Sequence, residues 1–394
     1  MYEELKQKFQ DTYSRSARFV FSAPGRTELG GNHTDHQLGR VLAGAVSVDT
    51  LAAVSPNGEG VIRVLSEGYP LCVIDLGDLS IRPEEAGSTA ALIRGVAAGI
   101  AQMGHKLTGF DAFVTSRVLP GSGLSSSAAF EVLIGTVISR LNDCGLNAIQ
   151  IAQLGQYAEN VYFGKPCGLM DQMASSVGGI VTIDFADKDH PVVEPLSFDF
   201  AACGHALCIV NSGADHADLT DEYAAIPREM HAVCQVFGKE HLREVDEQAF
   251  YARLPEVRAA AGDRAALRAM HFFDDNRRVA QQVEALKQND FDRFLQLVTE
   301  SGHSSWLYLQ NVAPTGSTRH QELALTLALA AKLLNGRGAC RVHGGGFAGT
   351  IQAFVPLDLL DGFKSGMEAV LGEGSCQVLS IRPEGGVLLE EVEA

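Results

Sequence analysis

Glycines and serines are concentrated in one short segment, residues 119–131 (LPGSGLSSSAAFE), between a predicted strand and a predicted helix. Gly121 and Gly123 allow backbone amides to turn inward and approach an anion closely. The helix opened by Ser125–Ser127 adds amides without internal partners and the positive end of its dipole. The segment therefore predicts a phosphate cradle without a lysine, in which the Ser127 hydroxyl can reach a Mg²⁺ ion bridging the phosphates.

This loop has one commoner interpretation, and two other motifs are excluded. A strand-to-helix connection with serine caps is the commoner use of such a composition. A Walker loop requires Gly-Lys before its Ser or Thr, and the segment contains no lysine. A hydrolase nucleophile elbow requires glycine two residues after the nucleophile, whereas Ser125 is followed by Ser126 and Ser127.

A second polar segment, residues 23–36 (APGRTELGGNHTDH), follows the first predicted strand as a glycine-rich loop. Its many hydrogen-bonding groups suit recognition of a polyhydroxylated ligand, because each sugar hydroxyl both donates and accepts. A solvated polar turn is the alternative, but the Ala-Pro-Gly-Arg start restricts the backbone before an arginine. The polar side chains are those of Arg26, Glu28, Asn32, His33, Asp35 and His36.

Strands and helices that must position these segments alternate without a strict βα order, which favours an α+β fold. A helix is expected at the start, then strands in 17–75, a helix over 89–103 and a strand from 110. Helices over about 126–141 and 147–163 follow, then strands near 178–185 and 205–210. The stretch 216–335 is predicted to be mainly helical, and strands near 338–355 and 376–382 come last.

The chain has 394 residues, which is too long for one ordinary core and predicts two domains. Its formal charge of -17 argues against nucleic-acid and anionic-membrane partners, which bind basic surfaces. No signal peptide or 18-residue apolar run is evident, so a cytoplasmic location is expected. Eight scattered cysteines without a Cys-x-x-Cys pair indicate reduced thiols rather than a zinc cluster or disulfides.

Together with Cys167–Gln172 (CGLMDQ) and Arg341–Gly349 (RVHGGGFAG), the two segments resemble the motifs of the GHMP small-molecule kinases, and most closely those of galactokinases. The three family motifs occur in the family's order, and the resemblance covers nearly the whole chain. It implies a two-domain architecture, with a ribosomal protein S5 domain 2-like N-terminal domain and a ferredoxin-like C-terminal domain. We place these domains at residues 1–195 and 196–394, with the active site in the cleft between them.

The resemblance also implies roles for individual residues. Asp171 matches the catalytic aspartate and Arg26 the arginine that faces it across the transferred phosphate. Ser127 and Glu159 match residues near the Mg²⁺ ion, although Glu159 could equally be a solvated side chain on an amphipathic helix. The implied sugar-binding residues are Asn32, His33, Asp35, Gly168 and Tyr223, and the implied ATP loop consists of Gly121, Ser122, Gly123, Leu124, Ser125, Ser126 and Ser127.

These matches imply ATP-dependent phosphorylation of the anomeric hydroxyl of galactose, with ATP and Mg²⁺ as cofactors and Asp171 as the base. We expect a monomer or a weak homo-oligomer. A non-catalytic sensor of galactose and ATP on the same fold is an alternative, but such sensors tend to have a damaged ATP loop. A nicotinamide-dependent oxidoreductase is disfavoured, since no Gly-x-Gly-x-x-Gly follows a strand with an acidic residue downstream.

The sequence departs from the galactokinase pattern at positions that affect specificity. Galactokinases usually have Glu at the position of Asn32, where it contacts the sugar's O6. An amide there would tolerate a carboxylate at C6, so galacturonate is an alternative substrate, as are N-acetylgalactosamine and arabinose. Glu28, Gly30, His36, His343 and Ala348 also replace the usual residues.

Overall fold

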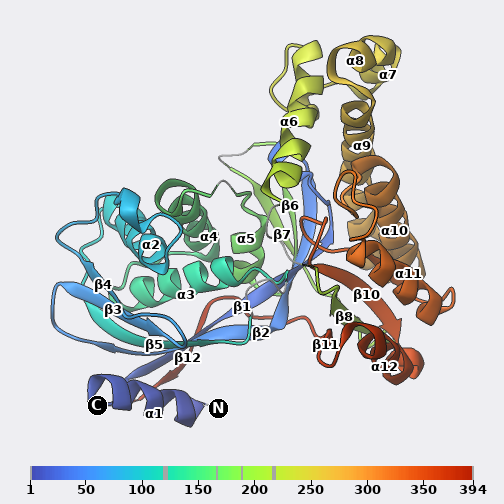
Figure 1. The fold of residues 1–394 in the computed structure, drawn as a ribbon. Coiled ribbons are helices and arrows are strands. Elements are labelled where there is room, and N and C mark those ends of the chain that lie inside the picture. Colours follow the sequence, from blue (N-terminus) through green and yellow to red (C-terminus); the bar gives the residue numbers. More distant parts are fainter. Residues whose placement is uncertain (1, 119–122, 166, 188–189, 215–218, 393–394) are drawn as a thin grey trace.

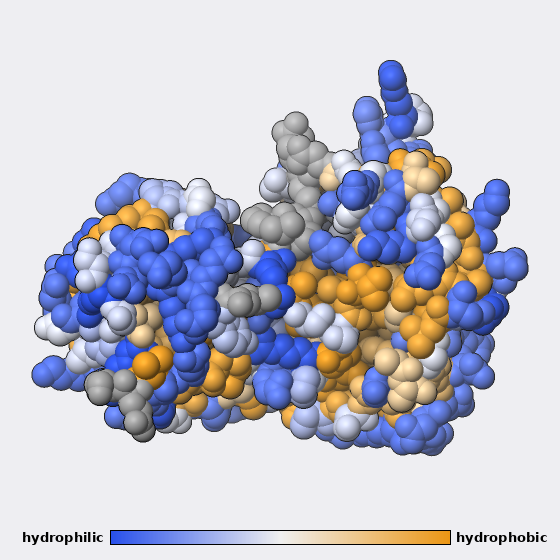
Figure 2. Space-filling view, turned by 90° about the horizontal axis from the view of Figure 1, so that it is seen from below, coloured by the Kyte–Doolittle hydropathy of each residue, from blue (hydrophilic) through white to orange (hydrophobic). Residues whose placement is uncertain are grey.

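The computed structural model describes residues 2–118, 123–165, 167–187, 190–214 and 219–392, and it has two lobes, each built on a β-sheet (Figure 1). The predicted α+β class is confirmed, because both sheets are mainly antiparallel and carry helices without a regular βα alternation. Seen from below, hydrophilic side chains cover most of the first lobe, and apolar side chains form a patch on the second lobe beside the seam (Figure 2).

The first sheet has eight strands in the order β12-β1-β2-β5-β3-β4, and β6 and β7 continue from a further part of β2. Only β3 and β5 pair in parallel among the strand pairs of the described residues. The strands are β1 (Phe19–Gly30), β2 (Arg40–Pro56), β3 (Val61–Ser66), β4 (Cys72–Asp75), β5 (Phe110–Ser116), β6 (Ile180–Asp184), β7 (Val192–Leu196) and β12 (Val387–Glu391).

Helices with apolar stripes cover this sheet and bury an aliphatic core that includes Val54, Ile93 and Leu133. The segment at the end of α4 continues as a π-helix, η3 (Ala158–Phe163), which carries Glu159. The helices of this lobe are α1 (Tyr2–Tyr13), α2 (Thr89–Gln102), α3 (Ser126–Leu141), α4 (Ala148–Tyr157) and α5 (Met170–Val177), with the short η1 (Asp35–Gln37) and η2 (Pro83–Glu85).

The second sheet is fully antiparallel in the order β11-β8-β10-β9. Its strands are β8 (His205–Asn211), β9 (Ala339–Val342), β10 (Thr350–Pro356) and β11 (Cys376–Leu379). The helices of this lobe are α6 (Thr220–Val236), α7 (Glu247–Ala252), α8 (Leu254–Ala261), α9 (Asp263–Lys287), α10 (Phe291–Ser304), α11 (Glu322–Leu334) and α12 (Leu360–Leu371), with the short η4 (Leu242–Glu244), η5 (Ser305–Leu309) and η6 (Leu357–Leu359).

Several elements differ from the sequence-based expectation. The polar motif at 23–36 is not wholly a loop, because β1 runs to Gly30 and pairs Arg26 with Ala45 of β2. Every residue of β1 is buried, so the strand has no exposed face. Its sequence therefore lacks the alternation of polar and apolar residues by which a half-exposed strand is recognised. The strands β7 and β12 were not expected from the sequence.

The predicted domain boundary at 195–196 falls at the end of β7 and stays a prediction. The chain does not divide simply there, because β12 returns to the first sheet and pairs with β1. All eight cysteines are free thiols, as the sequence predicted. Within the described ranges, no helix combines the length and the apolar character needed to cross a membrane.

Candidate active site

An arginine and an aspartate from distant parts of the chain form a bidentate ion pair. Arg26 of β1 donates from Nε to Asp171 Oδ1 at 2.7 Å and from Nη2 to Asp171 Oδ2 at 2.8 Å. Its third nitrogen, Nη1, donates to the Gly123 carbonyl at 2.6 Å, so one guanidinium links the aspartate to the glycine loop. Asp171 stands in the first turn of α5, where the helix dipole favours a negative charge.

This pair determines the protonation state of Asp171. Burial acts to raise the pKa of the carboxyl group, but the adjacent Arg26 and a hydrogen bond from Ser125 outweigh it and hold the pKa below its usual value. Asp171 is therefore ionised at neutral pH. Its side chain is 31% exposed, so a substrate hydroxyl can reach the carboxylate.

Ser125 of the glycine–serine loop turns toward Asp171 rather than capping the helix. Its backbone is left-handed (φ 62°, ψ 66°), its side chain makes no cap bond, and its hydroxyl donates to Asp171 Oδ2 at 2.5 Å. The Leu124 carbonyl accepts the Arg26 amide at 3.0 Å, and Ser126 begins α3. Gly121 and Ser122 lie outside the described residues.

The two predicted metal residues meet. Ser127 in the first turn of α3 donates to Glu159 Oε1 at 3.3 Å, and Lys165 Nζ lies 3.3 Å from the same oxygen. Glu159 is buried within η3, so it is not a solvated side chain on a helix surface. In the described part of the chain, no cluster of three or more His, Cys, Asp or Glu suited to a metal occurs.

A second buried carboxyl group, that of Glu131, lies behind this pair. Gln172 Nε2 donates to Glu131 Oε2 and to Glu159 Oε2, both at 2.9 Å. Burial and then the charge of Glu159 raise the pKa of Glu131 well above its usual value. The Glu131 Oε1 atom is buried without a hydrogen-bond partner among the described residues.

The predicted sugar residues from the first motif divide into two groups. His33 and Asp35 are partly exposed, and a side chain on Gly168 would strike Asp35, since a Cβ atom there would lie 1.9 Å from Asp35 Oδ2. Gly168 and Asp35 therefore lie together. Burial lowers the pKa of His33 to about 4, so its ring is neutral, and Nε2 lies 3.0 Å from the Gly345 carbonyl, to which only a protonated nitrogen can donate.

Asn32 is placed differently, since its side chain is fully buried and already bonded within the protein. Its Nδ2 donates to Gly344 O at 2.7 Å and to Glu28 Oε1 at 3.1 Å. Its Oδ1 accepts from Asn311 at 2.9 Å and Ser305 at 3.2 Å. Both amide protons and both acceptor positions are thus occupied, which leaves none for the predicted contact with a sugar hydroxyl.

Tyr223 of α6 and the third motif meet from the second lobe. The Tyr223 hydroxyl donates to the Gly346 carbonyl at 2.9 Å, and a Cβ atom on Gly345 would lie 2.7 Å from the Tyr223 ring. The motif's His343 is buried and neutral, and its Nε2 accepts the Glu28 amide at 3.2 Å. The loop is thereby fixed against β1, close to Arg26.

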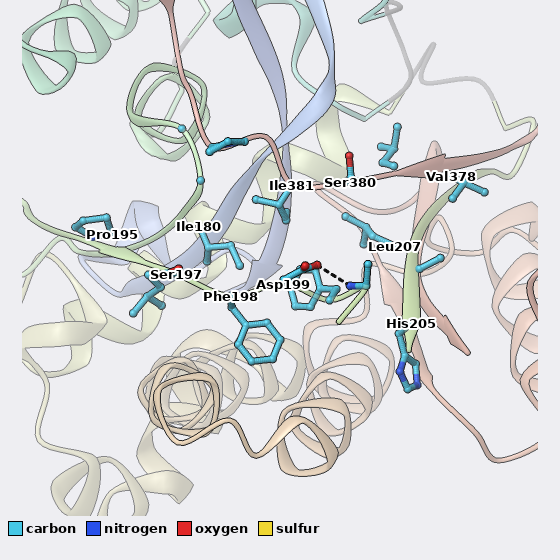
Figure 3. A pocket seen from close by; sticks show the side chains of 18 of the residues that line it. Ile180, Pro195, Ser197, Phe198, Asp199, His205, Leu207, Val378, Ser380 and Ile381 are labelled. Atoms are coloured by element: carbon cyan, nitrogen blue, oxygen red, sulfur yellow. Dashed lines mark hydrogen bonds between the residues drawn. The ribbon is translucent and has the colours of Figure 1, made fainter. Parts of the chain in front are cut away.

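A cavity of about 810 Å³ lies elsewhere on the seam, between β6 and the sheet of β8 and β11. Ile180, Leu207 and Ile381 line it with largely apolar side chains (Figure 3). None of the predicted catalytic, sugar or phosphate residues takes part in its lining. We therefore assign the candidate active site to the polar residues around Arg26 and Asp171.

Comparisons with known proteins define the class of the fold. Residues 89–179 match the N-terminal domain of GHMP kinases. The structure superposes on Lactococcus lactis galactokinase, solved in complex with galactose, with a TM-score of 0.83, 23% identity and coverage of 98% of this chain and 100% of that one. Methanococcus jannaschii mevalonate kinase gives a TM-score of 0.65 at 14% identity over 93% of this chain and 99% of that one. The fold is that of the GHMP kinases, as predicted.

Sequence similarity narrows the family. Residues 7–56 match the galactokinase galactose-binding signature. A galactokinase of Actinobacillus pleuropneumoniae serotype 5b is 34% identical over 353 residues, which cover 89% of this chain and 88% of that protein. The chain belongs to the galactokinase family. Membership of this kinase family implies the use of ATP.

Sequence reasoning did not assign roles to Glu131, Gln172, Lys165 and His343. Glu131 follows Ser127 by four residues, which places both on one face of α3, and Gln172 follows Asp171 directly. This spacing was the sequence feature that could have pointed to Glu131 and Gln172. His343 was noted only as a departure from the family pattern, and nothing in the sequence marked Lys165, because their contacts with Glu28 and Glu159 arise from the tertiary structure.

Proposed function

We propose that this protein transfers the terminal phosphate of ATP to the anomeric hydroxyl of galactose, giving galactose 1-phosphate and ADP. The galactose-binding signature and the galactokinase relatives support the substrate. The observation that carries the proposal is the Arg26–Asp171 pair, which joins the sugar motif, the glycine–serine loop and helix α5 at one point.

In this proposal Asp171 accepts the proton of the attacking hydroxyl. Its carboxylate already accepts two hydrogen bonds from Arg26 and one from Ser125, of about four that two oxygens can take. Among the described residues Oδ1 accepts one hydrogen bond, from Arg26 Nε, which leaves a lone pair there for the sugar. Its lowered pKa makes Asp171 a weak base, so proton transfer would occur late, as the oxygen–phosphorus bond forms and the hydroxyl becomes more acidic.

Arg26 has two roles in this proposal. It holds Asp171 ionised and oriented, and its charge would stabilise the phosphoryl group during transfer. Because the guanidinium also bonds the Gly123 carbonyl, the arginine fixes the glycine loop relative to the base. Such positioning accounts for most of the catalysis of phosphoryl transfer, where the protein has little covalent chemistry to perform.

Ser127 and Glu159 suit a Mg²⁺ ion, because a hydroxyl and a buried carboxylate oxygen are the hard ligands that it prefers. We propose that they hold the ion, with the phosphates and water supplying further ligands. When bound, the ion would neutralise charge on the phosphates. The Lys165 side chain is mostly exposed, so its amine would be able to move away from Glu159 when the ion binds.

For the sugar, we propose contacts from His33, Asp35, Gly168 and Tyr223. Neutral His33 offers Nδ1 as an acceptor, because Nε2 carries the proton that binds the Gly345 carbonyl. Asn32 would act indirectly, by supporting the loop through its bonds to Gly344 and Asn311. The argument for galacturonate assumed that Asn32 faces the sugar, so it loses its support.

A coupled assay of ADP release tests the proposal directly. The purified protein with ATP and Mg²⁺ is offered galactose, galacturonate, N-acetylgalactosamine, arabinose and mevalonate in turn. We expect the highest kcat/KM with galactose. ADP release with another sugar but not with galactose would overturn the substrate, and release with none of them would favour a sensor. The cytoplasmic location, the monomer or weak homo-oligomer, and the absence of nucleic-acid and membrane partners stay predictions.

A further inference from the structure

The Glu131–Gln172–Glu159 cluster brings two carboxyl groups together deep in the protein, and only one amide lies between them. Glu131 is 1% exposed, Glu159 3% and Gln172 0%. Lys165 Nζ lies 3.3 Å from Glu159 Oε1, but Glu131 forms no ion pair within the described residues. Burying such a carboxyl group is costly, and a fold that needed only a packed core here would use apolar residues. The cluster therefore calls for an explanation beyond packing.

The geometry of Gln172 is specific to holding carboxylates. Its two Nε2 protons are both used, one on Glu131 Oε2 and one on Glu159 Oε2, at 2.9 Å each. The reversed amide would instead bring its oxygen to 2.9 Å from an oxygen of each carboxyl group, where it could not donate to Glu159. Its own Oε1 is buried without a partner among the described residues, so the two donated bonds come at the cost of an unpaired acceptor.

Helices α3, α4 and α5 pack closely around the contact between Gln172 and Glu131. On α4, Gly155 approaches so closely that a Cβ atom would lie 3.1 Å from Gln172 Cγ, Glu131 Cβ and Glu131 Oε2. Glu131 follows Ser127 by one helical turn on α3, and Gln172 follows Asp171 on α5. The amide thus connects the helix of the proposed base to the proposed metal carboxylate.

We propose that Gln172 is a positioning residue. Its amide is fixed by Glu131 and donates to Glu159 Oε2, which orients the other oxygen, Oε1, toward Ser127. This inference rests on the proposed metal role of Ser127 and Glu159. Outer residues that orient metal ligands typically change metal affinity about 10–100-fold when they are replaced. Glu131 serves as the fixed anchor for the second proton of the amide, and a neutral acceptor in its place would serve as well.

The test measures metal binding apart from turnover. Mn²⁺, a spectroscopic substitute for Mg²⁺, is titrated by electron paramagnetic resonance into the protein with a non-hydrolysable ATP analogue. We expect Gln172→Met to weaken Mn²⁺ binding about tenfold or more, and Glu131→Gln to leave it within about twofold, because a glutamine oxygen still accepts from Gln172. A Mn²⁺ affinity unchanged in Gln172→Met would overturn the inference.

Two further variants separate positioning from folding. Gln282→Met removes another fully buried amide, which donates to the Leu29 carbonyl at 3.3 Å, and should lower the melting temperature without changing Mn²⁺ affinity. If Gln172→Met fails to fold, the double variant Gln172→Met/Glu131→Met removes the second buried acid as well. It should fold and still bind Mn²⁺ weakly, and wild-type affinity in the folded double variant would contradict the inference.

Glu159→Gln distinguishes failure of the inference from failure of the proposed function. Weakened Mn²⁺ binding in Glu159→Gln together with unchanged binding in Gln172→Met would refute the positioning role alone. Unchanged binding in Glu159→Gln would refute the metal role of Glu159 and the positioning role with it.

Discussion

Asp171 and Asp35 are partly buried carboxyl groups in the same site, but the protein surrounds them differently. Asp171 has a bidentate arginine and a serine hydroxyl, and its pKa lies below the usual value. Asp35 forms no ion pair within the described ranges, and burial raises its pKa to about 6. Burial acts in the same direction on both, so the partner decides the charge. One aspartate is held ionised, and the other titrates close to neutral pH.

Removing the base should have the largest effect. In Asp171→Asn the carboxylate is lost while Arg26 and the glycine loop stay, so kcat should fall about 10²–10⁴-fold. ATP affinity, measured by calorimetry, should change little. If the variant keeps most of its turnover in the ADP-release assay, Asp171 is not the base.

Replacing Arg26 with a neutral residue should raise the pKa of Asp171, as burial already raises that of Asp35. In Arg26→Gln burial is no longer outweighed, so the pKa of Asp171 rises, and kcat should fall about 10²-fold or more. The remaining activity should decline as pH falls through this raised pKa, where the carboxyl group takes up a proton. The wild-type profile should stay flat over the same range.

A pH–rate profile of kcat for both proteins checks this prediction. Arg63→Gln, which breaks the ion pair between Arg63 of β3 and Asp111 of β5, is the matched control and should keep the wild-type profile. A flat profile in Arg26→Gln would mean that another group holds Asp171 ionised.

Replacing Ser125 should have a smaller effect than replacing Arg26, because Ser125 supplies only the third hydrogen bond to Asp171. Ser125→Ala and Ser125→Gly both lose that bond, so each should lower kcat by about tenfold, on the order of 1–2 kcal/mol for a bond to a charged group. They should differ in stability, since glycine adopts φ 62° freely and alanine does not. The glycine variant should melt at the higher temperature, and equal melting temperatures would contradict strain at this position.

The smallest expected effect is the titration of Asp35. Galactose KM should rise as pH falls below about 6, because Asp35 then loses its charge, and Asp35→Asn should remove this dependence. The effect of Asp35 on stability has the opposite dependence: lower pH weakens galactose binding but removes a destabilising charge. The pKa is higher folded than unfolded, so Asp35 costs stability increasingly as pH rises from its ordinary value of 3.8 toward about 6. The melting temperature of Asp35→Asn should exceed that of the wild type more at pH 8 than at pH 4.

The sequence supports those parts of the site that depend on local pattern. The glycine–serine loop and the helix behind it follow from spacing and composition, and the structure contains α3 at the predicted place of that helix. The meeting of Arg26 with Asp171 was inferred from the resemblance, since 145 residues separate them. The order of motifs indicated which segments belong together.

Other features could not be predicted because distant segments create them. Asn32 is buried by residues such as His271, Asn311 and Gly344, which come more than 200 residues later. Without them, an amide in a polar motif is equally consistent with a ligand contact. The left-handed backbone of Ser125 was also hidden, because nothing in a run of three serines marks one of them for an unusual conformation.

The pairing of β12 with β1 has a consequence for synthesis of the chain. After β7 ends at Leu196, about 190 more residues must be translated before Val387 emerges to cover one side of β1. At about 5–20 residues per second this takes on the order of ten seconds or more. Throughout that interval the nascent first lobe presents unpaired main-chain groups along Phe19–Ser22, a possible template for wrong strand pairing until the last strand arrives.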